Sequence, residues 1–134
     1  MTLSKTDMEV LGRFDTRLIK SVEEESYTLL HCKYYAPDKY PFGGWVMIHK
    51  TTYLVETNNV GESIEMLHAI NIPYAPQKHF FKMHGEVLNF VLVFPKIPKH
   101  WTAFDLNEEA SLGNGFKIQE IRRNLSGIYR VQIH

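Results

Sequence analysis

Alternation is the feature that most constrains this chain, because in several short runs apolar residues recur at every second position between turn residues. Side chains of a β-strand point in turn to its two faces, so this period predicts half-buried strands rather than helices. The clearest runs cover residues 27–35 and 88–94, and Pro95 ends the second run because proline has no backbone donor. We therefore predict an all-β protein.

Further strands follow from the same rule. Residues 45–56 are apolar on both faces, which predicts one central strand, and residues 64–72 form another run before two prolines. Shorter strands are predicted at residues 80–81, 104–106, 116–121 and 129–133. About seven to nine antiparallel strands with frequent turn signals describe a β-sandwich.

The N-terminal stretch allows two interpretations. Apolar residues recur at helical spacing between Leu11 and Val22. Thr6 with Glu9 has the form of a capping box, which also favours a short N-terminal helix. The acidic turn that precedes Tyr27 instead favours a strand over residues 16–23 in a hairpin.

Length and charge narrow the class of protein. A chain of 134 residues suits one domain, which buries enough surface to be stable without a disulfide or a metal. Fifteen basic residues balance fifteen acidic ones, so we expect no nucleic-acid partner, and the lack of net charge allows a weak homodimer through an edge strand. No apolar run approaches the ~20 residues of a membrane span, and a signal peptide is not evident. These observations predict a cytoplasmic protein.

Histidine and cysteine side chains are the candidates for metal binding or catalysis. Seven histidines raise the question of a metal site, and His31 and His49 would have to meet across neighbouring strands, with Glu56 or Glu86 as a third ligand. A small metal-dependent binder or enzyme built on them is the alternative function. Cys32 excludes an internal disulfide because it is the only cysteine, and strand parity makes it a buried small hydrophobe. We therefore predict no catalytic residue, metal site or cofactor.

Aromatic residues are concentrated in one connection between strands. The segment 34–45 contains five aromatic residues and two prolines, and a further tryptophan follows Pro98 in a polar loop. Rings held on a rigid loop can stack on sugars or fill a partner's pocket, although rings at strand ends can also plug the core. The candidate binding residues are Tyr35, Tyr40, Phe42, Trp45 and Trp101.

The order of several motifs carries a family resemblance. The most specific are Phe94-Pro-Lys-Ile-Pro98 and Asp105-Leu-Asn-Glu108, and the others are Thr52-Tyr-Leu-Val-Glu56, Ile70-Asn-Ile-Pro73, His79-Phe80 and Gly115-Phe-Lys-Ile-Gln-Glu-Ile121. Over residues 16–123 the chain resembles small immunoglobulin-like β-sandwich domains of anaerobic gut bacteria. The resemblance implies that fold, no established chemistry, and an exported location. It divides the single domain into an N-terminal extension (1–15), a family-like core (16–123) and a C-terminal strand (124–134).

These observations together predict a non-catalytic immunoglobulin-like module. We expect it to bind a protein partner or a glycan through loop aromatics or through a sheet edge. The residues of the Pro95–Pro98 stretch predict a bend where the chain passes from one sheet to the other, because both prolines lack the donor that a ladder needs.

Overall fold

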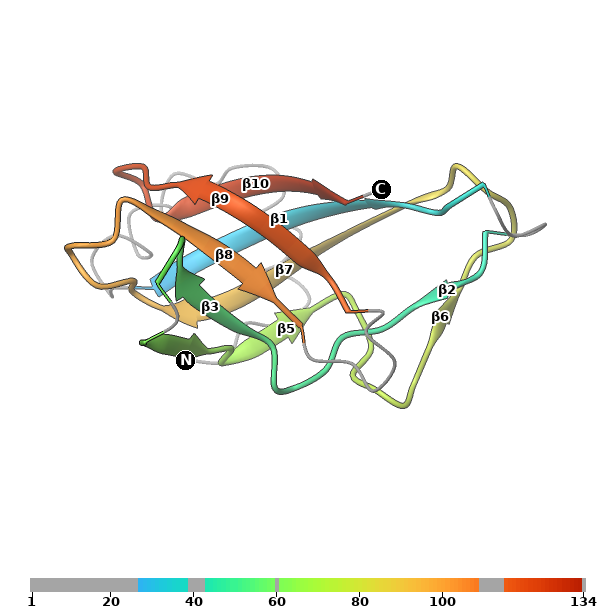
Figure 1. Ribbon diagram of the computed structural model, residues 1–134. Coiled ribbons are helices and arrows are strands. Elements are labelled where there is room, and N and C mark those ends of the chain that lie inside the picture. Colours follow the sequence, from blue (N-terminus) through green and yellow to red (C-terminus); the bar gives the residue numbers. More distant parts are fainter. Residues whose placement is uncertain (1–26, 39–42, 60, 109–114, 134) are drawn as a thin grey trace.

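The computed structural model describes residues 27–38, 43–59, 61–108 and 115–133, and these form ten strands with no helix among them (Figure 1). The strands are β1 Tyr27–Tyr35, β2 Trp45–Val46, β3 Tyr53–Glu56, β4 Ser63–Glu65, β5 His68–Ile70, β6 His79–Phe80, β7 Val87–Pro95, β8 Ala103–Asn107, β9 Lys117–Arg122 and β10 Ile128–Ile133. The all-β prediction is confirmed. Within the described segments, no helix is long and apolar enough to cross a membrane.

The strands form two four-stranded sheets and a two-stranded ribbon. The first sheet has the order β10-β1-β7-β5, the second sheet has the order β4-β3-β8-β9, and β2 and β6 form the ribbon. Every strand pair is antiparallel except β1 with β10, which run parallel with Leu29 opposite Ile128 and Tyr34 opposite Ile133. The prediction of purely antiparallel pairing is wrong at this pair. A parallel pair needs a long connection, and most of the described chain lies between these two strands.

Side chains from both sheets share one core. From the first sheet, Leu30 and Phe90 point into it, and from the second sheet Leu54 and Phe104 do so. The register places Leu30 opposite Leu92 in the first sheet and Leu54 opposite Leu106 in the second. Alternation along each strand therefore sends one set of side chains between the sheets, as the sequence predicts.

The first sheet is also apolar on its outer face. Leu29, Ile70, Val91 and Val93 form a second cluster there, and Val91 is fully buried. This explains why β7 carries apolar side chains on both of its faces from Phe90 onward. The predicted strand at 88–94 is confirmed as the centre of the first sheet.

The predicted single strand at 45–56 is wrong, because the chain turns between His49 and Thr52. The amide of Thr52 donates to the His49 carbonyl oxygen at 3.1 Å, and the Thr52 hydroxyl donates to the same oxygen at 2.6 Å. β2 therefore lies in the ribbon and β3 in the second sheet. Apolar alternation continues on both sides of the turn, so parity alone does not show it.

The predicted run at 64–72 is divided in the same way. The Met66 amide donates to the carbonyl of Thr52, the residue just before β3. The next amide, that of Leu67, donates to the Val93 carbonyl in β7. β4 therefore belongs to the second sheet and β5 to the first. One step of the backbone changes the sheet that the chain pairs with.

The passage between sheets after β7 is confirmed. β7 ends at Pro95 in the first sheet, and β8 begins at Ala103 in the second. The N-terminal helix and the alternative strand at 16–23 lie outside the described residues.

Candidate binding surface

The five predicted binding residues differ in how exposed their side chains are. Trp45 is 45% exposed on β2, whereas Trp101 is fully buried. Tyr35 is half-buried at the end of β1, with the Lys33 ammonium 5.6 Å from its ring centroid. Tyr40 and Phe42 lie outside the described residues. Of the predicted binding residues that the structure describes, Trp45 is therefore exposed and Tyr35 partly so, and their role as contact residues stays a prediction.

Trp101 is a core residue, so its prediction as an exposed contact is wrong. Its amide donates to the Pro98 carbonyl at 3.0 Å, and its own carbonyl accepts a hydrogen bond from Arg123 Nη1 at 3.1 Å. The link between the two sheets folds back at this turn and places the indole in the core with Phe90 and Phe104. Polar neighbours in the sequence therefore do not predict exposure for a residue in a link that passes between the two sheets.

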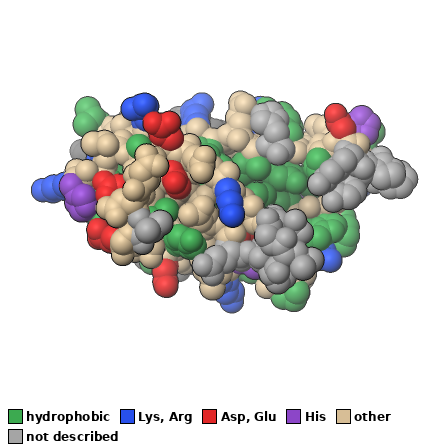
Figure 2. All heavy atoms as spheres, viewed as in Figure 1, with side chains coloured by type: hydrophobic (Ala, Val, Ile, Leu, Met, Phe, Trp, Pro, Cys, Tyr) green, Lys and Arg blue, Asp and Glu red, His purple; other side chains and the backbone are tan. Residues whose placement is uncertain are grey.

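Trp45 has an aromatic partner that the sequence analysis did not select. In the ribbon Trp45 lies directly opposite Phe80, and Phe80 is 68% exposed. Cross-strand neighbours point to the same face, so the two rings lie side by side on the solvent face of the ribbon. We call Trp45 and Phe80 the aromatic patch. Figure 2 shows hydrophobic side chains at the end of the molecule where Figure 1 places the ribbon.

The opposite face of the ribbon is buried. Val46 is 3% and Phe81 6% exposed, and the Phe81 ring stacks on Tyr34 of β1 with 5.7 Å between centroids. The signal that finds Phe80 is therefore the His-Phe-Phe sequence: in a strand that buries Phe81, its neighbour must face solvent.

Backbone hydrogen bonds fix the ribbon to the end of β1. The Phe81 amide donates to the Gly44 carbonyl at 3.0 Å, which continues the pairing of β2 with β6. The Ala36 amide donates to the Glu86 carbonyl at 2.8 Å, and a carboxylate oxygen of Glu86 accepts the Lys82 amide at 2.6 Å. The chain segments next to the aromatic patch are thus held in place by these hydrogen bonds.

Gly43 allows the backbone to approach closely next to the aromatic patch. Its φ is +82°, and a Cβ atom there would lie 2.7 Å from the Met83 carbonyl oxygen and 2.9 Å from the Ala36 Cβ. Only glycine combines this left-handed conformation with such contacts without strain. Gly43 therefore positions the chain immediately before Trp45.

Lys78 is the charged residue that contacts the aromatic patch. Its ammonium lies 4.4 Å from the centroid of the Trp45 ring, which is within the range of a cation–π interaction. A shallow hollow of about 380 Å³ next to it is lined by Pro76, Gln77, Lys78 and Phe80. Lys78 therefore places one positive charge on the Trp45 ring, beside a shallow hollow.

His31 and His49 do not come together. His31 alternates with the core residues Leu30 and Cys32, so it lies on the outer face of the first sheet. His49 lies in the turn before β3, where its amide donates to Glu108 Oε2 at 2.7 Å. In the part of the chain that the structure describes, no three His, Cys, Asp or Glu side chains are placed to hold a metal ion.

Glu108 is a buried carboxylate that joins two turns. It is 5% exposed, and its second oxygen, Oε1, accepts the Phe116 amide at 3.0 Å. Two backbone donors from distant parts of the chain thus converge on it, and the His49 imidazole Nδ1 lies 3.7 Å from Oε2. Its role is to fix the turn that leads from the ribbon to β3. The sequence indicated the residue through its Asp-Leu-x-Glu motif but not this role.

Burial controls the ionisation of the two residues at positions 31 and 32. Burial, with the neighbouring positive charge of Arg130, lowers the pKa of His31. Burial alone raises the pKa of the Cys32 thiol, which is the unreactive state of a structural cysteine. Cys32 is thus a core residue, as strand parity predicts.

Comparisons of the chain with protein-family models, curated proteins and solved structures found no match. The family resemblance of the sequence motifs stays a prediction. The geometry and chemistry of the described surface are what indicate a function.

Proposed function

We propose that this protein is a non-catalytic immunoglobulin-like β-sandwich module that binds a protein partner through the aromatic patch. The observation that carries the proposal is the pairing of Trp45 and Phe80, two large aromatic residues directly opposite each other and 45% and 68% exposed. Supporting the fold assignment, two sheets share one core and the chain passes between them after Pro95.

Exposed aromatic pairs are unusual on a surface without a partner. Single exposed apolar residues need no explanation, but neighbouring large ones mark interaction sites. Tryptophan is enriched among the residues that dominate binding energy, and a rigid base lowers the entropy lost on association. Met83, in the turn after β6, is 60% exposed, and its backbone carbonyl lies close to Gly43, so it adds an exposed, adaptable apolar residue near the ribbon.

The chemistry of the patch favours a protein over a glycan. A sugar stacks on a ring face and needs hydrogen-bonding groups beside it, whereas the Lys78 ammonium covers the Trp45 ring at 4.4 Å. Phe80 offers no hydrogen bond to hydroxyl groups, and the thioether of Met83 is only a weak acceptor. A protein surface with an apolar anchor beside an acidic side chain fits the two rings and Lys78 together.

The test is capture with matched variants. Trp45→Ala and Phe80→Ala should each weaken binding of the captured partner by about tenfold or more, because loss of one hot spot costs about 2 kcal/mol. Leu67→Ala is the control, because Leu67 is 53% exposed between β4 and β5, away from the ribbon. It should bind like the wild type. All three variants should lose no more than about 1 kcal/mol in the free energy of unfolding.

Two outcomes would overturn the proposal. A partner that binds all three variants equally would place recognition elsewhere, for example on a sheet edge or on a second copy of the chain. Binding to a glycan array that Trp45→Ala abolishes would assign the patch to a sugar. Lys78→Glu sharpens the test, since it should weaken the binding of an acidic protein partner more than Lys78→Ala does.

A further inference from the structure

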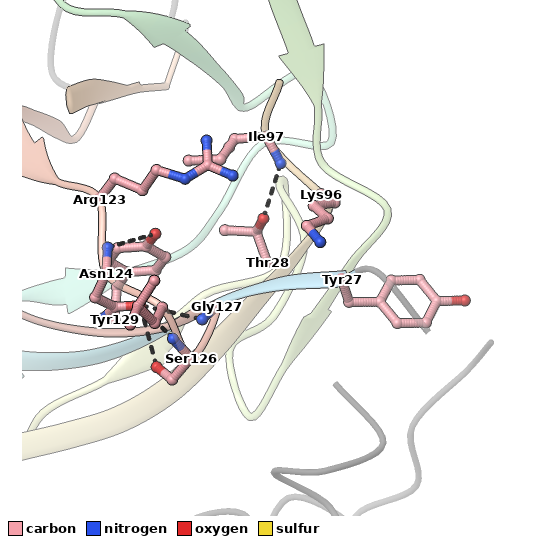
Figure 3. A pocket seen from close by; sticks show the side chains of 10 residues that line it. Tyr27, Thr28, Lys96, Ile97, Arg123, Asn124, Ser126, Gly127 and Tyr129 are labelled. Carbon is pink, nitrogen blue, oxygen red and sulfur yellow. Dashed lines mark hydrogen bonds between the residues drawn. The ribbon is translucent and has the colours of Figure 1, made fainter. Parts of the chain in front are cut away.

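A pocket of about 450 Å³ lies where the start of β1, the link between β7 and β8, and the turn between β9 and β10 meet (Figure 3). In Figure 1 these segments are at the opposite end of the molecule from the ribbon. Its size is within the range of small-ligand sites. The pocket is independent of the aromatic patch and needs its own explanation.

The pocket is positively charged. Lys96 and Arg123 both line it, and the lining residues that the structure describes include no aspartate or glutamate. In the described chain, Lys96 has no ion pair or hydrogen bond. Two cations with no carboxylate among the described lining residues favour an anionic ligand.

Arg123 is held in place with donors left over. Its Nη1 donates to the Pro98 carbonyl at 2.6 Å and to the Trp101 carbonyl at 3.1 Å, which fixes the guanidinium against the link. Its Nη2 and Nε have no hydrogen-bond acceptor among the described residues. A guanidinium anchored at one nitrogen and open at the others is arranged to bind an oxyanion.

A buried hydroxyl supplies a third donor. Thr28 is 1% exposed and lines the pocket, and its Oγ1 accepts the Ile97 amide at 3.2 Å. Its O–H has no acceptor within the described chain. Figure 3 shows the Lys96 and Arg123 side chains on the two sides of this hydroxyl.

The turn at the other side of the pocket is internally satisfied. Asn124 Oδ1 accepts the amides of Ser126 and Gly127 at 3.1 and 3.0 Å, and the Asn124 amide donates to the buried Tyr129 hydroxyl. These groups therefore do not compete for the three donors. They hold the wall of the pocket in a fixed position.

We propose that this pocket binds a tetrahedral oxyanion, the phosphate or sulfate group of a small ligand, with Lys96, Arg123 and Thr28 as its donors. The three donors come from three separate elements and approach from different directions. A phosphate or sulfate has enough oxygens for all three, whereas a carboxylate has two oxygens in one plane. The exposed Leu125 and the side chain of Ile97 provide apolar contacts for the body of such a ligand.

The experiment is a titration of the full chain at low ionic strength with inorganic phosphate, sulfate and acetate, followed by amide NMR. Phosphate and sulfate should shift the Ile97 and Gly127 signals and saturate with a Kd of about 1 mM or tighter. Acetate should bind at least about tenfold more weakly, because it reaches fewer of the donors. Titration with phosphoserine and with a sulfated sugar then distinguishes the two sources of the group.

Lys96→Gln is the mutational test, because within the described chain Lys96 makes no hydrogen bond or ion pair that the substitution would break. It should weaken phosphate binding about tenfold or more and leave the unfolding midpoint unchanged. Lys99→Gln is the control, an exposed lysine in the same link that does not line the pocket. Failure of phosphate to saturate, equal binding of acetate, or equal weakening by the two lysine variants would each overturn the proposal.

Discussion

Each of the two tryptophans follows a short stretch that begins with proline, and the two side chains end in opposite environments. Trp45 follows a Pro-Phe-Gly-Gly stretch and is 45% exposed, whereas Trp101 follows a Pro-Lys-His stretch and is fully buried. The link that holds Trp101 passes between the two sheets, so its side chains can enter their shared core. The ribbon that holds Trp45 pairs only with itself. The path of the backbone relative to the core decides whether a loop aromatic is buried or exposed.

The largest expected effect is on Trp101. Trp101→Ala should lower the free energy of unfolding by about 3–5 kcal/mol, because it leaves a cavity between the sheets. Trp101→Phe should cost less, since the indole Nε1 has no hydrogen-bond partner among the described atoms and little polar interaction is lost. Denaturant unfolding measures both values. A cost for Trp101→Ala no larger than that for Trp45→Ala would remove the contrast between the two regions.

Substitution of Glu108 tests the turn that connects the ribbon to the second sheet. Glu108→Gln should cost about 1–3 kcal/mol, because the amide group of glutamine cannot accept both the His49 and Phe116 amides. Glu65→Gln is the matched control, since Glu65 is exposed. The free energy of unfolding and the amide signals of His49 and Phe116 report the change. Equal values for the two variants would show that the turn does not depend on this carboxylate.

Substitution of Gly43 tests the close backbone approach next to the aromatic patch. Gly43→Ala should cost about 1–2 kcal/mol, because alanine is strained at a φ of +82° and its Cβ would press on Met83. Gly61→Ala is the control, because a Cβ there meets only Asn59 Oδ1 at 3.4 Å. Hydrogen exchange of the Phe81 amide should accelerate in Gly43→Ala and stay unchanged in Gly61→Ala. Unchanged exchange in both variants would show that the ribbon does not need this glycine.

The smallest effect concerns His31, which is half-buried in the first sheet. Because its pKa is lowered in the folded protein, the unfolded chain binds the proton more readily as the pH falls below about 6.5. Folding stability should therefore decrease on acidification through this range. An NMR titration should place the pKa of His31 below 6.5. In His31→Gln this part of the pH dependence should vanish, and a pKa above that value would contradict the assignment of His31 to a buried face.

Much of the sheet structure follows from local sequence. The run at 27–35 and the run at 88–94 become β1 and β7, and Cys32 is buried as its parity predicts. Alternation reports which residues share a face, and this holds wherever one strand continues without a turn. It does not report where a strand passes from one sheet to another.

The alternation of apolar side chains by itself determined that this chain is all-β and which side chains share a face of each continuous strand. Only the tertiary structure decided that residues 45–56 divide between a ribbon and a sheet, that Trp101 packs while Trp45 is exposed, and that Glu108 joins two turns. The same holds for the pocket beside Lys96 and Arg123. The physical reason is range: strand parity is set by neighbouring residues, whereas burial and converging donors depend on segments far apart in the sequence.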